Sequence, residues 1–165
     1  MIPPLLFGSI VYYLVGFYSD SMTFLRFILS LVLFNLSCSS ICLVIAILIE
    51  NHGVANLVAS LTILFSMLFG GFLLNKDSIP AVLSWLKYLS TFYYAYEALI
   101  VNELINVKLR DQTIIDVVIA GRLILKQFGF DEDGYVRNVI SLAVMFTVSL
   151  IVAFLFLKFL VKEKR

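Results

Sequence analysis

The chain has 165 residues, of which 62% are hydrophobic, with a mean hydropathy of +1.04 and a formal net charge of +1. Soluble domains are usually about half apolar, so this composition indicates an integral membrane protein. A net charge close to zero excludes the basic footprint of a nucleic-acid-binding protein. The start Met1-Ile2-Pro3-Pro4 lacks the basic residues of a secretory signal, and we expect the chain to be the back part of something longer.

Four apolar windows without charges are each about as long as a membrane helix, which needs roughly 20 residues. They predict an all-α membrane protein with about four transmembrane helices and short re-entrant or external helices. The predicted spans are about 3–18, 24–49, 54–74 and 138–161, and a re-entrant and external region covers 75–137.

The orientation follows from the lysines and arginines, which gather on the cytosolic side of membrane proteins. Lys158, Lys162, Lys164 and Arg165 predict a cytosolic C-terminus. Counting back through the spans, region 75–137 is external, and the N-terminus is cytosolic.

The second predicted span contains both cysteines of the chain, Cys38 and Cys42, which with Ala46 recur every fourth residue. Such a stripe of small residues is typical of a contact between helices. Two cysteines inside an apolar run do not indicate a disulfide framework, and without further ligands they do not indicate a metal site.

The third predicted span carries Thr62, Ser66, Phe69 and Leu73 on one helical face. Hydroxyl groups gain nothing against lipid, so this face is expected to meet protein or a cavity. An ordinary buried contact between helices remains the alternative for these residues.

The stretch after the third span is too polar to cross a bilayer alone and too apolar for a solvated loop. It is predicted to lie at or dip into the outer face of the membrane, packed against the spans. Its two acids, Glu97 and Glu103, are six residues apart and so lie on different helical faces, which excludes a paired-carboxylate catalytic site. A buried acid here would be a functional candidate, and a hydrogen-bonded helix end or a solvated face is the alternative.

The stretch Arg110–Phe130 alternates apolar and charged residues and predicts an amphipathic helix over the outer ends of the spans. The acid-rich turn that follows lacks the ligand spacing of a calcium-binding loop. The last span is almost featureless and predicts a lipid-facing outer helix with a basic anchor.

Motifs for catalysis are missing from this sequence. It has neither of the glycine-rich loops that cradle nucleotide phosphates, and its single histidine, His52, has no plausible nucleophile as a partner. We therefore expect no enzymatic activity in this chain.

The order and spacing of several motifs resemble the membrane domain of the ABCG (white) subfamily of ABC transporters, in its C-terminal part. A third span that ends in G-G-F-L-L-N is followed by P-x-x-x-x-W-x-x-Y-x-S and then by Y-A-Y-E-A-L-x-x-N-E. The matching residues are Gly70, Gly71, Phe72, Leu73, Leu74, Asn75, Pro80, Trp85, Tyr88, Ser90, Tyr94, Tyr96, Glu97, Ala98, Leu99, Asn102 and Glu103. The likeness covers nearly the whole chain.

The resemblance implies the last four of six membrane helices of a half-transporter. Such proteins form homodimers or heterodimers and export lipids, sterols or other hydrophobic small molecules across the plasma membrane or an internal membrane. The nucleotide-binding domain, with its ATP and Mg, would lie outside this chain. Two alternatives stay open: a truncated, non-transporting partner that regulates full-length half-transporters, or a permease subunit whose ATPase is a separate chain.

Residue roles are implied where the motifs match. Phe72 and Leu73 correspond to the apolar plug of the exit. The substrate cavity would be lined by Thr62, Phe65, Ser66 and Phe69, and Glu103 would lie beside the roof. The external region has no cysteines, so a dimer would be held without disulfide bonds.

Overall fold

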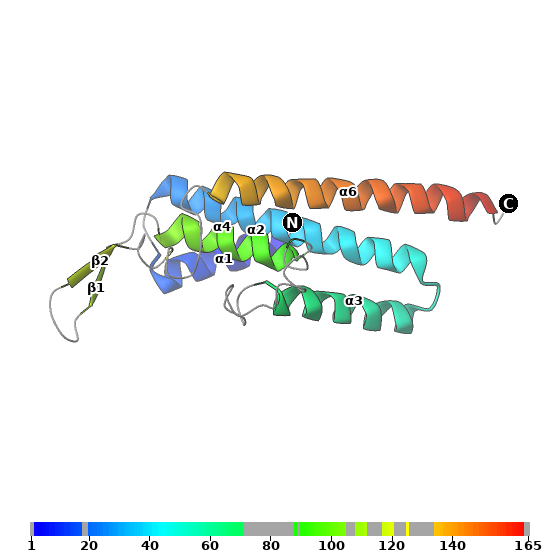
Figure 1. Cartoon of the computed structure of the whole chain (residues 1–165), viewed down its shortest axis with the longest axis horizontal. Coiled ribbons are helices and arrows are strands. Elements are labelled where there is room, and N and C mark those ends of the chain that lie inside the picture. Colours follow the sequence, from blue (N-terminus) through cyan, green and yellow to red (C-terminus); the bar gives the residue numbers. More distant parts are fainter. Residues whose placement is uncertain are drawn as a thin grey trace.

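The computed structural model describes residues 2–17, 20–70, 88, 90–104, 108–111, 117–120, 125 and 134–163. These residues form five helices and two short strands (Figure 1). In chain order they are α1 (Ile2–Val15), α2 (Ser21–Leu48), α3 (His52–Leu68), α4 (Thr91–Leu104), β1 (Lys108–Asp111), β2 (Val117–Ala120) and α6 (Gly134–Glu163).

Two of the helices, α2 and α6, are long and apolar enough to cross a membrane. Their 28 and 30 residues correspond to about 42 and 45 Å, against roughly 30 Å of bilayer hydrocarbon. The helices α1 and α3 are also apolar, with 14 and 17 residues. The predicted class, an all-α membrane protein, is confirmed by this architecture.

The long helices α2 and α6 lie side by side, and α2 also packs against α1, α3 and α4, so α2 is the central helix of the bundle (Figure 1). The Ser37 hydroxyl of α2 donates a hydrogen bond to the Leu142 carbonyl of α6 over 2.9 Å, and both residues are fully buried. The opposite side of α6 exposes apolar residues such as Ile140 and Val144. The prediction of a lipid-facing last helix therefore holds for one side of α6 only, because the other side packs on α2 and α4.

Helices α3 and α4 follow one another along α2. At the start of α4, the Thr91 hydroxyl lies 3.6 Å from the thiol of Cys38 in α2. At the end of α4, the amide of Asn102 donates to the Thr23 carbonyl, at the beginning of α2, over 2.9 Å. Because α3 packs on the remaining part of α2, the two shorter helices together accompany α2 over most of its length (Figure 1).

Local interactions and the local backbone conformation determine where α3 begins and ends. The side chain of Asn51 accepts hydrogen bonds from the backbone amides of Gly53 and Val54 and so caps the first turn. The helix ends at Leu68, whereas the predicted span continues to Leu74. Phe69 and Gly70 form a turn instead, and residues 71–74 lie outside the described part of the chain.

The turn between α1 and α2 begins with a glycine in the left-handed region, Gly16 at φ +70°. The amide of Phe17 bonds back to the Tyr12 carbonyl over 3.4 Å. This is the Schellman arrangement that ends many helices, and it brings the end of α1 against the start of α2.

An antiparallel hairpin projects beyond the ends of the helices (Figure 1). It pairs β1 with β2 in the register Lys108 to Ala120 and Asp111 to Val117. The prediction of one amphipathic helix over 110–130 is therefore wrong for these strands. The β-branched run Val117-Val118-Ile119 favours a strand, and the alternation of apolar and charged residues fits that period as well.

Candidate functional site: a pocket on α3

A pocket of about 320 Å³ lies along α3. Its lining residues recur at the three- and four-residue steps that place side chains on one helical face. They are Val58, Leu61, Thr62, Phe65, Ser66 and Phe69, joined by Ser90 from the segment before α4. All four predicted cavity residues thus line one pocket, and their role in binding a substrate stays a prediction.

The pocket combines a broad apolar wall with a few hydroxyl groups. The rings of Phe65 and Phe69 stack with their centroids 6.0 Å apart, and Phe65 is 57% exposed. The Thr62 hydroxyl donates to the Val58 carbonyl over 2.8 Å, so it can only accept a hydrogen bond from a ligand. Apolar area with few polar groups suits a hydrophobic or amphipathic small molecule.

Ser90 joins the end of α3 to the start of α4. Its hydroxyl donates to the Ser66 carbonyl of α3 and accepts from the Tyr93 amide over 3.2 Å, which is the geometry of a helix N-cap. Ser90 is almost completely buried. The sequence reasoning did not assign this serine to the cavity, although a serine before an apolar helical run is a recognised capping signal.

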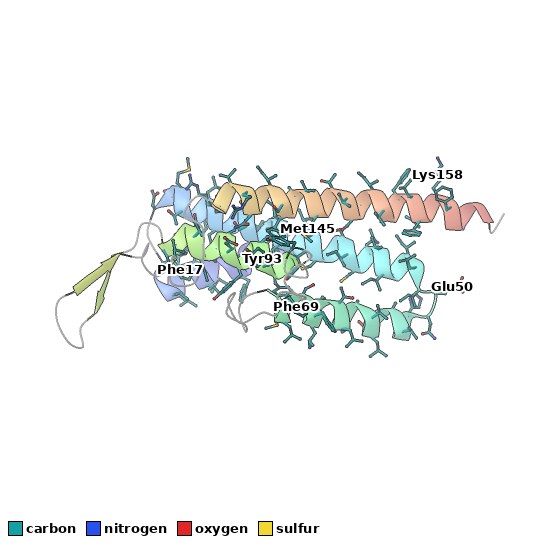
Figure 2. All side chains as sticks on the ribbon, in the orientation of Figure 1. Phe17, Glu50, Phe69, Tyr93, Met145 and Lys158 are labelled. Atoms are coloured by element: carbon teal, nitrogen blue, oxygen red, sulfur yellow. The ribbon has the colours of Figure 1, made fainter. Side chains whose placement is uncertain are left out.

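The two helices also approach closely at Gly70. A Cβ atom at this position would lie 2.7 Å from the Cβ of Phe92, which is too close for any side chain. The Phe92 ring in turn packs edge-on against Phe34 of α2 at 4.8 Å. In Figure 2, Phe69 and Tyr93 mark this junction. The predicted exit plug, Phe72 and Leu73, lies outside the described residues.

The two acids of α4 are both buried, but they point to different helices. Glu97 is 1% exposed, and its carboxylate lies 3.7 Å from the guanidinium of Arg137 in α6. Glu103 accepts a hydrogen bond from the Asn102 amide over 3.2 Å, next to the start of α2. Neither acid is among the pocket's lining residues. For both acids, the solvated-face alternative is wrong.

The comparisons with known proteins agree on a family. A family model described as "ABC-2 type transporter" matches residues 1–104. The chain is 35% identical over 167 residues to the "Probable ATP-dependent permease" of Saccharomyces cerevisiae. The aligned region covers 100% of this chain and 16% of the relative.

Two further relatives carry ABCG names. "ABC transporter G family member 24" of Dictyostelium discoideum is 33% identical over 167 residues, or 100% of this chain and 14% of the relative. The "Broad substrate specificity ATP-binding cassette transporter ABCG2" of Bos taurus is 32% identical over 171 residues, or 98% of this chain and 26% of the relative. The chain thus spans about a quarter or less of the length of these relatives. With the resemblance of the motifs confirmed in this way, the chain belongs to the ABC-2 type transporter family and, within it, to the ABCG transporters.

Proposed function

We propose that this chain is the membrane-spanning part of an ATP-driven half-transporter that exports lipid, sterol or other hydrophobic small molecules. The single observation that supports this most is the pocket on α3, where a stacked pair of phenylalanine rings meets the hydroxyl groups of Thr62 and Ser66. The relatives' names add to it, because one is called an ATP-dependent permease and another a transporter of broad substrate specificity.

The pocket opens on a side of α3 that the described residues leave exposed. Leu57, Leu61 and Phe65 are 66%, 58% and 57% exposed on that helix. A second half-transporter that faces this side would close the pocket and bury these side chains. We therefore place the substrate between two copies, or between this chain and a related one.

In this proposal the chain is a multi-pass protein. The helices α1, α2, α3 and α6 lie in the membrane, and α4 is the re-entrant helix that continues the path of α3 along α2. Energy comes from ATP bound with Mg on a nucleotide-binding domain outside this chain. The hairpin of β1 and β2 lies on the external side.

The test uses the complete transporter in proteoliposomes, with ATP-driven movement of a fluorescent phospholipid, a sterol and a hydrophobic dye as readouts. Phe65→Ala and Phe69→Ala are expected to lower transport about tenfold, since each removes ring contacts worth about 1 kcal/mol or more. Leu64→Ala is the matched control, because Leu64 is a 56% exposed α3 residue outside the pocket lining.

The proposal would be rejected if the parent protein moved none of the three probes. Equal transport by Phe65→Ala, Phe69→Ala and Leu64→Ala would instead reject the pocket as the substrate's binding place.

A further inference from the structure

A second pocket, of about 130 Å³, lies at the turn between α1 and α2, away from the pocket on α3. It is lined by Tyr12, Tyr13, Asp20, Ser21 and Phe24. Nothing in the proposed export function uses these residues. Their combination of aromatic rings and one carboxylate points to a ligand of its own.

Three of the lining residues form a compact group of rings. The ring centroids are 6.1 Å apart for Tyr12 and Tyr13, 5.0 Å for Tyr12 and Phe24, and 5.7 Å for Tyr13 and Phe24. The rings meet edge to face or tilted, at interplanar angles of 84°, 69° and 38°, so a cation can lie over the face of one of these rings at a time, within about 6 Å of its centroid. Tyr12 is 4% exposed and anchors the three rings in the protein, whereas the Tyr13 ring is 75% exposed and accessible to a ligand.

Asp20 supplies the charge. It is the residue before α2, where an aspartate commonly caps the helix, yet its side chain makes no capping hydrogen bond. Among the described residues that line the pocket, Asp20 is the one with a charge. A carboxylate that is exposed and not engaged by the helix end attracts a cation and repels an anion.

Helix α1 also carries exposed apolar residues. Ile10, Leu14 and Val15 of α1 are 57%, 80% and 60% exposed. A ligand with a cationic head and a hydrocarbon tail would place its head between the rings and Asp20 and its tail along α1. A bulky cation that cannot donate hydrogen bonds suits rings better than a primary ammonium does, because it is less strongly hydrated.

We propose that the pocket between α1 and α2 binds the quaternary ammonium group of choline, carried by a phosphatidylcholine headgroup or by soluble choline. This site is separate from the pocket on α3, so the proposal can be tested independently of the export function.

The experiment measures which lipid the complete transporter retains. The protein is placed in nanodiscs of phosphatidylglycerol with a minor share of phosphatidylcholine, and bound lipids are counted by native mass spectrometry. The wild type and Tyr13→Phe, which keeps the ring, are expected to retain phosphatidylcholine. Tyr13→Leu and Asp20→Asn are expected to retain about two- to thirtyfold less. Both substituted residues are exposed, so the fold tolerates the changes.

A second arm separates the two sources of the ligand. Saturation-transfer NMR with choline chloride detects binding of the free cation in the same four proteins. Phosphatidylcholine retention without a choline signal assigns the site to the lipid headgroup. A choline signal that Asp20→Asn abolishes, without lipid retention, assigns it to soluble choline. If neither measurement distinguishes the wild type from Tyr13→Leu and Asp20→Asn, the proposal is wrong.

Discussion

The carboxylate of Glu97 is the most deeply buried charge among the described residues. It is 1% exposed, while Arg137, 3.7 Å away, is 60% exposed. Gly134 makes room for this contact, because a Cβ at that position would lie 3.3 Å from the Glu97 carboxylate and 3.5 Å from the Arg137 guanidinium. Together these groups tie α4 to α6.

Removing the cation is expected to cost more than removing the acid. Arg137→Met removes a cation that lies 3.7 Å from a buried carboxylate and should lower the free energy of unfolding by about 1–3 kcal/mol. Glu97→Gln leaves an exposed arginine that water can solvate, so its effect should be smaller. Thermal unfolding in detergent measures both, with Arg137→Lys as the charge-preserving control. A smaller loss for Arg137→Met than for Glu97→Gln would contradict this view.

At the scale of elements, the junction of α3 and α4 depends on Ser90 and Gly70. Ser90→Ala removes the N-cap of α4 and its bond to the Ser66 carbonyl, which should cost about 1–2 kcal/mol of stability. Gly70→Ala should cost more than that, because its new Cβ would lie 2.7 Å from the Cβ of Phe92.

The measurement for both variants is thermal unfolding together with the rate of chemical labelling of a cysteine placed at Leu61, in the pocket. The control is Ser141→Ala, whose hydroxyl donates to the Arg137 carbonyl within α6. If the junction variants unfold and label like Ser141→Ala, the junction does not fix α4.

How far the sequence predicts these elements depends on the range of the interactions. Charges bound the apolar windows from which the spans are predicted, at Arg26 and Glu50 for the second and at Arg137 and Lys158 for the last. The helices α2 and α6 therefore lie within a few residues of their predicted spans. The hairpin was missed because an alternating pattern fits both helical and extended periods when β-branched residues are given too little weight.

The range of the interactions also decides which pocket residues can be predicted from the sequence. Four of the lining residues lie on one face of α3 because of the helical repeat, and their spacing in the sequence predicts this directly: Thr62, Phe65, Ser66 and Phe69. Ser90 is 24 residues beyond Ser66, and no local pattern says which carbonyl its hydroxyl reaches. In the same way, the burial of Glu97 depends on Arg137 and α6, which are far along the chain.

At the scale of the whole molecule, the uncovered side of α3 predicts a dimer contact. With Cys38 and Cys42 replaced by serine in the complete transporter, Leu61→Cys should give a cross-linked dimer under mild oxidation. Val144→Cys is the control, because it is similarly exposed but lies on α6. Cross-linking by Val144→Cys alone would move the contact to α6.

The orientation of the bundle makes a separate prediction. A tag inserted near Asp131 should be reachable by antibodies on intact cells, or on the lumenal side for an internal membrane. A tag after Arg165 should be reachable only once the membrane is permeabilised, because the basic C-terminus is expected in the cytosol. The reverse pattern would invert the topology.

The succession of α3 and α4 along α2 also governs how the nascent chain enters the bilayer. Helix α4 has 14 residues and buries Glu97, Asn102 and Glu103, so it is too short and too polar to partition into lipid as it leaves the ribosome. Two of these buried groups have neighbours on the long helices: Glu97 lies 3.7 Å from Arg137 near the start of α6, and Asn102 donates to the Thr23 carbonyl at the start of α2. We therefore expect α4 to take its place in the bundle only after α6 has been synthesised, so a chain truncated before Gly134 should be less stable than one that keeps α6.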